Sequence, residues 1–441
     1  MSIKPFPHPD LSLWQSAVDE VVAKHAGGAQ TQDVDAGPVA IQRPDMSDGM
    51  VQATVTMGQY LHNGVSLASQ AAAAGGPKAT EGVGDWAKYC SSIWWQIAKA
   101  KATGNAQAEQ SWRARLGPFS SCDPRYAEAA EQYVGYFKLK GGKVPYKVWS
   151  NLNDFTINDA LPANARVAIV GDWGTGQQDA KALLAALARK NPHVVIHLGD
   201  IYYSGTRFEM DNYFMSIWKS ALDLTKTRTF SLSGNHDMYC GGQPYYAMIQ
   251  ALGQPASYFC LRNDDWQFVA IDTGLHDDDA FGSSPTYLED TEVQWLTQKV
   301  QTAGTRRTVL LSHHQLFTAF DSVGVPGSLN PKLSAQVGSL LPNVTVWFWG
   351  HEHNQVIYKP YQGVLARCIG HGGYPVGITE IPATPLFPEV PLADVTLSKG
   401  PSFYSHGYMI LDLDGPRATA SYYQSSDPEN TPMFTETFGA A

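Results

Sequence analysis

The chain of 441 residues is long enough to form one large domain or two of ordinary size. Its hydrophobic content of 44% and charged content of 16% are typical of a folded globular protein. The net charge of −10 argues against non-specific binding to nucleic acid, because phosphate backbones are held mainly by Lys and Arg. An anionic substrate would need local positive charge, which metal ions can supply.

The first residues, Met1 to Pro5, lead into a polar stretch without the apolar core of a secretory signal. No apolar run of roughly 18 residues suggests a membrane span. We therefore expect a cytoplasmic protein. Five widely spaced cysteines without a C-x-x-C pair favour reduced thiols over a disulfide framework or a zinc knuckle.

Apolar side chains recur at helical spacing from about residue 10 to about residue 140, for example at Trp86, Ile93 and Ile97. The glycine pair Gly141-Gly142, followed by a proline, is typical of a boundary. We expect a mainly helical N-terminal region of unknown role over residues 1–150 and a second domain over residues 151–441.

Short apolar runs then replace the helical pattern, and each ends at a glycine or a polar residue. These runs are 167–170, 194–198, 229–232, 309–312 and 344–349. Strands that are buried on both faces and separated by helical segments such as 179–190 predict an α/β domain with central β-sheets flanked by helices. Ligands in such sheets bind beyond the carboxyl ends of the strands.

The C-terminal part, from about residue 355, is rich in Pro, Gly and Tyr. Residues 408–415 and 418–423 flank an Asp-Gly turn, which is typical of a β-hairpin. The preceding residues 382–401 form a proline-punctuated loop that could shape a pocket or lie over the surface.

Five segments at the ends of the apolar runs are rich in oxygen or imidazole donors. They are 171–174, 199–203, 234–237, 313–314 and 350–353. Two cations about 3.5–4 Å apart need several ligands and usually one bridging carboxylate, so the donors must converge from several strand ends. Each segment alone could be an ordinary turn, but the ordered set of five predicts a two-metal hydrolase. Carboxylate, phenol, amide and imidazole donors suit iron, manganese or zinc.

The ordered segments resemble the calcineurin-like metallophosphoesterase superfamily over about residues 165–375. Two details resemble its purple acid phosphatase branch. The first superfamily motif, Asp-x-His, is Asp172-Trp173-Gly174 here, and the purple enzymes share that departure. They replace the lost histidine with a tyrosine three residues after the aspartate of the second motif, a position that Tyr203 occupies here. The resemblance implies a layered metallophosphoesterase domain over residues 151–441.

The resemblance also implies a ligand set, carried over one residue at a time. The first metal would be held by Asp172, Asp200, Tyr203 and His353. The second would be held by Asn235, His313 and His351, with Asp200 bridging. Two metal ions per chain are expected, Fe(III) at the first position and a divalent Fe, Zn or Mn at the second. His351 and His353 lie two apart, so on an extended segment both side chains project the same way.

His236 stands between the predicted ligand Asn235 and Asp237. The resemblance places it near the scissile phosphate, where a metal-activated hydroxide would attack phosphorus. The imidazole would protonate the leaving alkoxide or stabilise the developing charge, with Asp237 fixing its tautomer. The alternative is a structural histidine at a turn.

Four further residues are candidates for the substrate pocket. They are His314, His371, Arg207 and Tyr202. His314 stands in the family's His-x-Pro pattern, although Gln315 replaces the proline. His371 lies among glycines that allow close backbone approach. For Arg207 and Tyr202 a surface or packing role is the alternative.

Hydrolysis of phosphate monoesters is the expected activity, with a small phosphorylated molecule as substrate. A phosphodiesterase acting on nucleotides or glycerophosphodiesters is the alternative, because the same metal core supports both reactions. A third hypothesis makes the N-terminal region, with Trp86, Trp94 and Trp95, an interaction or lid module of a regulated binding protein on the same scaffold. The oligomeric state is left open.

Overall fold

The computed structural model describes residues 32–34, 41–43, 105–108, 144–277, 285–323, 327–378, 381–400 and 403–439. The chain divides into two compact units, Met1–Lys143 and Val144–Ala441. In the first unit, strands β1 (Gln32–Val34) and β2 (Ile41–Arg43) pair antiparallel, and residues 106–108 form a helical turn. The helices expected elsewhere in this region, and Trp86, Trp94 and Trp95, lie outside the described residues.

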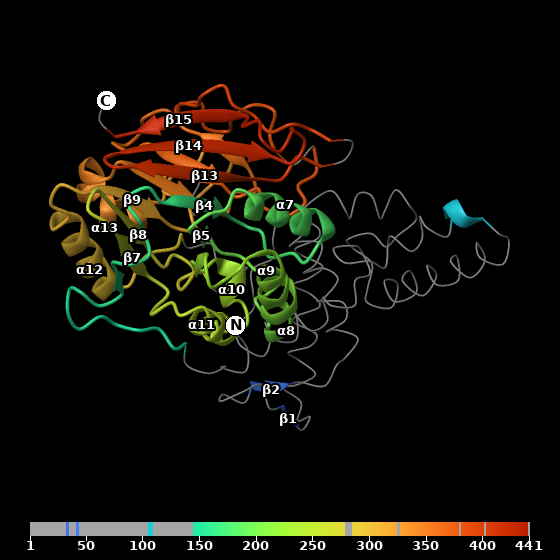
Figure 1. Ribbon diagram of the computed structural model, residues 1–441, viewed down its shortest axis with the longest axis horizontal. Helices are drawn as coiled ribbons and strands as arrows, with labels where there is room; N and C mark the ends of the chain where they lie inside the picture. Colours follow the sequence, from blue (N-terminus) through green and yellow to red (C-terminus); the bar gives the residue numbers. More distant parts are fainter. Residues whose placement is uncertain are drawn as a thin grey trace. The chain divides into compact units, whose positions relative to one another are not determined.

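The second unit contains two β-sheets, of which one has six strands in the order β15-β14-β13-β4-β5-β6 (Figure 1). Its strands are β4 (Arg166–Val170), β5 (Val194–His197), β6 (Arg228–Ser231), β13 (Gly407–Asp414), β14 (Arg417–Gln424) and β15 (Phe434–Phe438). Strands β4, β5 and β6 are parallel, whereas β13 pairs antiparallel with both β4 and β14. The β13–β14 pair is the hairpin expected around the Asp-Gly turn.

The other sheet has seven strands in the order β11-β12-β10-β9-β8-β7-β3. Its strands are β3 (Thr156–Ile157), β7 (Phe259–Arg262), β8 (Trp266–Ala270), β9 (Arg307–Leu311), β10 (Val346–Trp349), β11 (Gln355–Ile357) and β12 (Ala366–Ile369). Its central strands β8, β9, β10 and β12 are parallel. The five strands expected from the apolar runs are β4, β5, β6, β9 and β10, and all five are present.

Helices and helical turns lie between the strands along the chain. They are α7 (Gln178–Arg189), α8 (Arg207–Glu209), η1 (Met210–Met215), α9 (Ser216–Ala221), α10 (Asn235–Met238), α11 (Gln243–Ala251), α12 (Asp290–Gln301), α13 (Pro331–Val337) and η2 (Gly338–Asn343). Helix α7 corresponds closely to the helical segment expected over 179–190.

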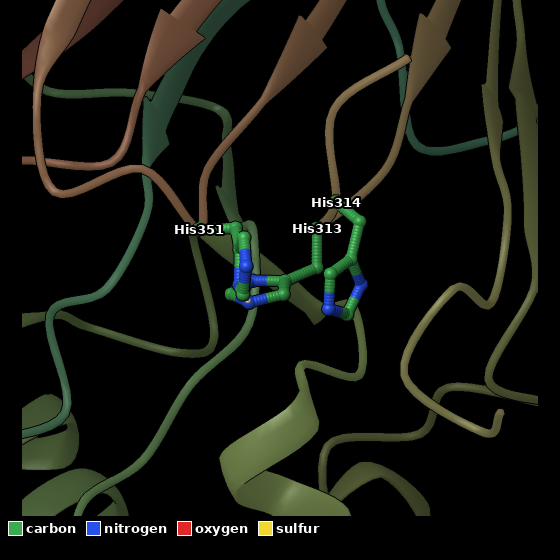
Figure 2. Close-up of side chains that lie close together, drawn as sticks. All are labelled: His313, His314 and His351. Carbon is green, nitrogen blue, oxygen red and sulfur yellow. Dashed lines mark hydrogen bonds between the residues drawn. The ribbon is translucent and has the colours of Figure 1, made fainter. Parts of the chain in front are cut away.

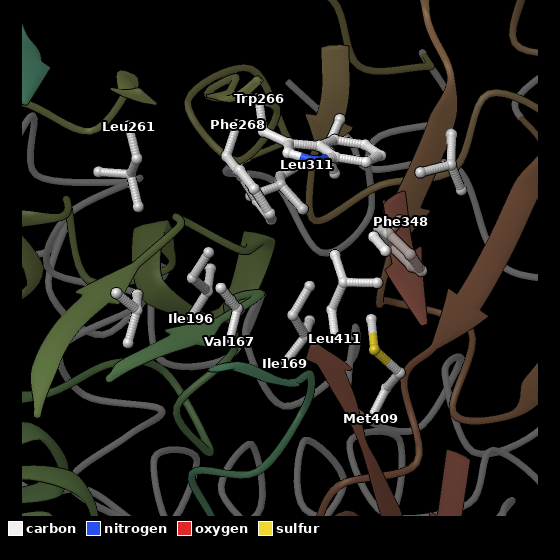
Figure 3. Packing of buried hydrophobic residues seen from close by; sticks show 14 of the residues in the cluster. Val167, Ile169, Ile196, Leu261, Trp266, Phe268, Leu311, Phe348, Met409 and Leu411 are labelled. Carbon is white, nitrogen blue, oxygen red and sulfur yellow. The ribbon is translucent and has the colours of Figure 1, made fainter. Parts of the chain in front are cut away.

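The main core lies between the two sheets. Val167 and Ile169 of β4 pack in one buried cluster with Phe268, Leu311 and Phe348 of the seven-stranded sheet (Figure 3). Because side chains alternate along a strand, the intervening residues of β4 face the other way. They join a cluster with helices α7, α9 and α11.

The seven-stranded sheet is covered in the same way, since its outer face packs against α12 and α13. The strands are thus buried on both faces, as their unbroken apolar runs predicted, and the α/β fold class with flanked central sheets is confirmed. Three cysteines in the described part of the chain, Cys240, Cys260 and Cys368, are buried free thiols. None of the helices described there has the length and hydropathy that crossing a bilayer requires.

Candidate metal centre

Asn235, His313 and His351, the predicted ligands of the second metal ion, lie close together. They are called the second donor set. Asn235 Oδ1 lies 3.0 Å from His313 Nε2 and 3.1 Å from His351 Nδ1, and these two nitrogens are 3.2 Å apart. Figure 2 shows the His313 and His351 rings turned toward one another. Adjacent ligands of an octahedral ion with bonds of about 2.1 Å are about 3.0 Å apart. The separations therefore fit one shared cation.

Asp172 and His353, predicted ligands of the first metal ion, lie close to Tyr202. These three residues are called the first donor set. The Tyr202 hydroxyl lies 3.0 Å from Asp172 Oδ1 and 3.0 Å from His353 Nε2, while Asp172 Oδ1 and His353 Nε2 are 3.5 Å apart. These separations again match the spacing of ligands around one ion. Tyr202 was expected only as a substrate contact, so its place beside two predicted metal ligands was missed.

Asp200 lies between the two sets. Its Oδ1 accepts a hydrogen bond from the His236 main-chain amide at 3.0 Å. Its Oδ2 is buried 3.4 Å from His313 Nε2 and has no hydrogen-bond partner among the described residues. A buried carboxylate oxygen without a partner is costly, and a cation would compensate its charge. The donor set and this orphaned oxygen fit the two metal ions that the sequence implies.

Neighbouring groups orient the donors of the second set. The Nδ1 of His313 donates to the Leu198 carbonyl at 2.9 Å, which leaves Nε2 as the donor toward the set. The Asn235 side-chain NH2 donates to the Tyr239 hydroxyl at 2.6 Å, so the amide oxygen faces His313 and His351. Such outer hydrogen bonds fix the tautomer and direction of metal ligands.

The backbone is unusual at three donor positions. Asp172, Asp200 and His351 have φ values of 55°, 73° and 64°, in the left-handed region that non-glycine residues rarely adopt. Two glycines make room for the carboxylates. A Cβ atom at Gly234 would overlap the Asp200 carboxylate, and one at Gly350 would lie 2.6 Å from Asp172 Oδ2.

Asp200 and His313 shift each other's pKa. Burial alone would raise the pKa of Asp200, but His313 and His236 outweigh it and hold this pKa well below its ordinary value. Burial opposes protonation of His313, yet the negative charge of Asp200 raises the pKa of His313 to about 9. A buried anion therefore sits at the centre of the donors, which is the charge a cation requires.

Asp237 has a different partner from the one predicted. Its carboxylate accepts hydrogen bonds from the main-chain amides of Asp200, Ile201 and Gly234 at 3.0, 3.1 and 2.8 Å. The prediction that Asp237 fixes the tautomer of His236 is wrong, because its oxygens are directed to these amides. Asp237 instead ties together the loops that follow β5 and β6.

The tautomer of His236 is set by Tyr203. His236 Nδ1 lies 2.7 Å from the Tyr203 carbonyl, which can only accept, so Nδ1 carries a proton. His236 Nε2 is left 3.8 Å from Asp200 Oδ2. The Tyr203 amide in turn donates to the buried Glu209 carboxylate. The predicted role of the Tyr203 hydroxyl as a metal ligand stays a prediction.

His314 lies beside the second donor set, with its ring centroid 4.3 Å from that of His351 (Figure 2). Its Nε2 is 2.8 Å from Asp277 Oδ2 and its Nδ1 is 3.0 Å from the Thr273 hydroxyl. Both of these partners follow β8 and were missed, because no sequence motif marks them. The orientation of the His314 imidazole, at the edge of the site, is thus fixed by Asp277 and Thr273.

The other two candidates for the substrate pocket, Arg207 and His371, have no side-chain hydrogen bond or ion pair with either donor set among the described residues. Arg207 forms an ion pair with Asp211 at 2.7 Å, and 67% of its side chain is exposed. His371 is buried against Gly407, and neither ring nitrogen has a hydrogen-bond partner among the described residues. Burial lowers the pKa of His371 to about 3. Their described contacts are a surface ion pair and a packed ring, and their predicted substrate contact stays a prediction.

Comparison with known proteins gives one family match, in which residues 165–355 fit the family described as calcineurin-like phosphoesterase. Similar solved structures include a purple acid phosphatase from yellow lupin (Lupinus luteus) seeds, with 15% identity and a TM-score of 0.45 over 63% of this chain and 55% of that chain. A dimetal phosphatase from Danio rerio shows 14% identity and a TM-score of 0.42 over 63% and 99%. No curated protein matches the sequence. The chain spans about half the length of the lupin protein.

Proposed function

Because residues 165–355 of this chain belong to the calcineurin-like phosphoesterase family, we propose that the protein hydrolyses phosphate monoesters with two metal ions. The observation that carries the proposal is the convergence of two donor sets on Asp200, whose buried Oδ2 has no hydrogen-bond partner among the described residues. The preference for monoesters over diesters rests on the resemblance to the purple acid phosphatase branch.

Each ion has its own ligands. Asp172, His353 and the predicted ligand Tyr203 would hold the first ion. The second donor set would hold the second ion, with Asp200 shared between the two. The carboxylates and the predicted Tyr203 phenolate at the first ion favour Fe(III), whereas the neutral amide and imidazoles of the second set favour a divalent Fe, Zn or Mn. When bound, two such ions polarise the phosphoryl oxygens and lower the pKa of a water molecule.

The residues of this chain then orient the substrate and move a proton. His236 receives its orientation from the Tyr203 carbonyl and keeps Nε2 directed toward the site. In the protonated form, Nε2 donates its proton to the oxygen of the leaving alcohol. Burial lowers the pKa of His236, although the charge of Asp200 opposes this shift, so the protonated form is populated in acid.

The test is metal analysis combined with assays on p-nitrophenyl phosphate and bis-p-nitrophenyl phosphate. We expect two ions per chain and faster hydrolysis of the monoester. Asn235→Ala and His313→Ala should each remove the second ion and most of the turnover. Arg189→Ala is the matched control, because its exposed side chain pairs with Glu429 at 2.7 Å and belongs to neither donor set.

Three results would contradict parts of this proposal. Faster turnover of the diester would replace the monoesterase with a phosphodiesterase. Two bound ions without hydrolysis of either ester would favour a binding protein on the same scaffold. Unchanged metal content in both Asn235→Ala and His313→Ala, with normal rates, would remove the second donor set from the metal centre.

A further inference from the structure

We propose that Glu209 is a positioning residue, which fixes the direction of the Tyr203 carbonyl and thereby the imidazole of His236. Glu209 lies outside both donor sets and outside the five donor-rich segments of the sequence. The inference rests on the proposed function, because it needs His236 to donate a proton to the leaving alcohol. It adds a residue that acts on the reaction only through the orientation of that imidazole.

The Glu209 carboxyl group is buried and accepts hydrogen bonds from three main-chain amides of one loop. Only 4% of the residue is exposed. Its Oε1 accepts from the Tyr203 amide, whereas Oε2 accepts from the Ser204 and Thr206 amides at 3.1 and 2.8 Å. Buried polar atoms are stable only where they have such partners, so this side chain determines where the amides point.

The Ser204 amide and the Tyr203 carbonyl belong to the same peptide group. This group is trans, and a trans peptide group is planar with its N–H and C=O on opposite sides. Because Glu209 Oε2 binds the N–H, the carbonyl points the other way, where His236 Nδ1 lies 2.7 Å from its oxygen. The Glu209 carboxyl group therefore sets the direction of the acceptor that fixes the His236 tautomer.

Gly205 brings the same loop against the segment that carries His236. Its φ of 60° lies in the left-handed region. A Cβ atom at Gly205 would lie 2.7 Å from Asp237 Cα and 3.0 Å from the His236 carbonyl oxygen, so only glycine fits here. The two segments thus pack directly on each other, and a turned Tyr203 carbonyl would change the position of the imidazole.

Glu209 is held in place by the helical turn that it closes. Its amide donates to the Thr206 hydroxyl at 3.3 Å, and its side chain accepts from the Thr206 amide, which together form a capping box. The residues that follow, Met210 and Phe214 of η1, are buried in the cluster that covers the six-stranded sheet. The carboxyl group therefore comes from an element that the core fixes independently of the loop.

The experiment measures Glu209→Gln on two esters, p-nitrophenyl phosphate and an alkyl phosphate, together with bound metal per chain. Glutamine keeps the length of the side chain, but its NH2 group cannot accept from an amide. We expect wild-type metal content and a rate on the alkyl ester that falls at least about tenfold, part of what a general acid contributes. The rate on p-nitrophenyl phosphate should stay within about twofold, because its leaving group needs no proton.

Asp154→Asn is the matched control. The Asp154 carboxylate also accepts from two main-chain amides, of Ser150 and Asn151, at 2.7 and 3.0 Å, but it belongs to neither donor set. Both rates should stay at the wild-type level in this variant. A substitution that merely reduced the amount of folded enzyme would lower the rates on both esters by the same factor.

A double variant tests whether Glu209 acts through His236. If it does, adding Glu209→Gln to His236→Ala should cause no further loss on either ester, because the imidazole is already absent. Independent effects would instead multiply. The comparison needs only steady-state rates of the two single variants and the double variant.

The outcomes separate this inference from the proposed function. Equal losses on both esters, or a further loss in the double variant, would overturn the inference. Loss of a bound ion from Glu209→Gln would also overturn it, because the residue would then hold the metal donors. Each of these results leaves hydrolysis by the wild type standing, whereas a wild type that hydrolyses neither ester overturns the proposed function. If Glu209→Gln fails to fold, Glu209→Asp, which keeps the carboxyl group but reaches less far, is measured by the same ratios.

Discussion

The two sheets of the second unit contribute different donor atoms to the candidate metal centre. The six-stranded sheet delivers the oxygen donors, which follow β4, β5 and β6: Asp172, Asp200, Tyr202 and Asn235. The seven-stranded sheet delivers only imidazoles, which follow β9 and β10: His313, His351 and His353. Each donor set combines oxygens from one sheet with nitrogens from the other, so neither sheet alone can hold an ion in this arrangement.

Contacts between the loops of the two sheets set this combination. The His351 amide donates to Asp172 Oδ2 at 3.0 Å, and His313 Nδ1 donates to the Leu198 carbonyl that follows β5. Beneath them, residues of both sheets share one buried core. The site is therefore assembled by the packing of two sheets, and changes at their junction should have the largest effects.

Asp200→Ala should cause the largest loss of bound metal and of turnover. Asp200 is the carboxylate between the two sets, and its removal would take a ligand from both proposed ions. We expect fewer than two ions per chain and a fall in turnover of at least about 1000-fold, a loss of about 4 kcal/mol in transition-state stabilisation. Metal analysis and steady-state rates measure it. Full metal content with wild-type turnover would show that the two sets do not depend on this residue.

His236→Ala should lower the reaction rate without lowering the metal content. The rate should fall by about two to four orders of magnitude, while both ions stay bound. The loss should be larger for alkyl phosphates than for p-nitrophenyl phosphate, whose leaving group needs no proton. Because the pKa of His236 is lowered, the wild-type rate on alkyl esters should rise as pH falls below 6.5, and the variant should lack this rise. An equal loss on all esters would leave only charge stabilisation.

Asp237→Asn should loosen the oxygen-donor side of the site. One carboxylate oxygen accepts from two amides, of Asp200 and Gly234, and the other from Ile201. An asparagine NH2 group cannot accept, so at least one of these contacts is lost. We expect metal affinity to fall about tenfold, with activity restored by excess metal, in titrations of the metal-free protein. A variant with unchanged affinity would mean that the two loops hold their positions without this carboxylate.

His371→Leu should have the smallest effect, because it lies outside both donor sets. The folded-state pKa of about 3 lies below the ordinary value of 6.5, so between these values the unfolded chain binds a proton that the folded chain does not. Stability is therefore lost as pH falls through this window. In denaturant titrations of metal-free protein, the wild type should lose about 1 kcal/mol per pH unit more than the variant. Lost activity in the variant at pH 7 would return His371 to the substrate pocket.

The sequence was sufficient to predict strand ends and most donors, because an apolar run that stops at Gly-Asp or Gly-His marks where a buried strand leaves the core. It could not predict that the Tyr202 hydroxyl lies beside Asp172 and His353, since that contact depends on how the loop packs against Gly174, which is distant in the chain. The partners of Asp237 were missed for the same reason. Asp277 and Thr273 hold His314 without any motif around them.

A protein that was not under selection for activity would not keep non-glycine residues at positions 172, 200 and 351, where the backbone is left-handed. Left-handed backbone at a non-glycine residue costs about 1–3 kcal/mol, and glycine adopts it without that cost. Selection for stability alone would therefore replace these candidate ligands before it changed any residue of the hydrophobic core. Asp172→Gly should raise the melting temperature of the metal-free protein while abolishing its activity, which makes this centre a place where stability and function trade against each other.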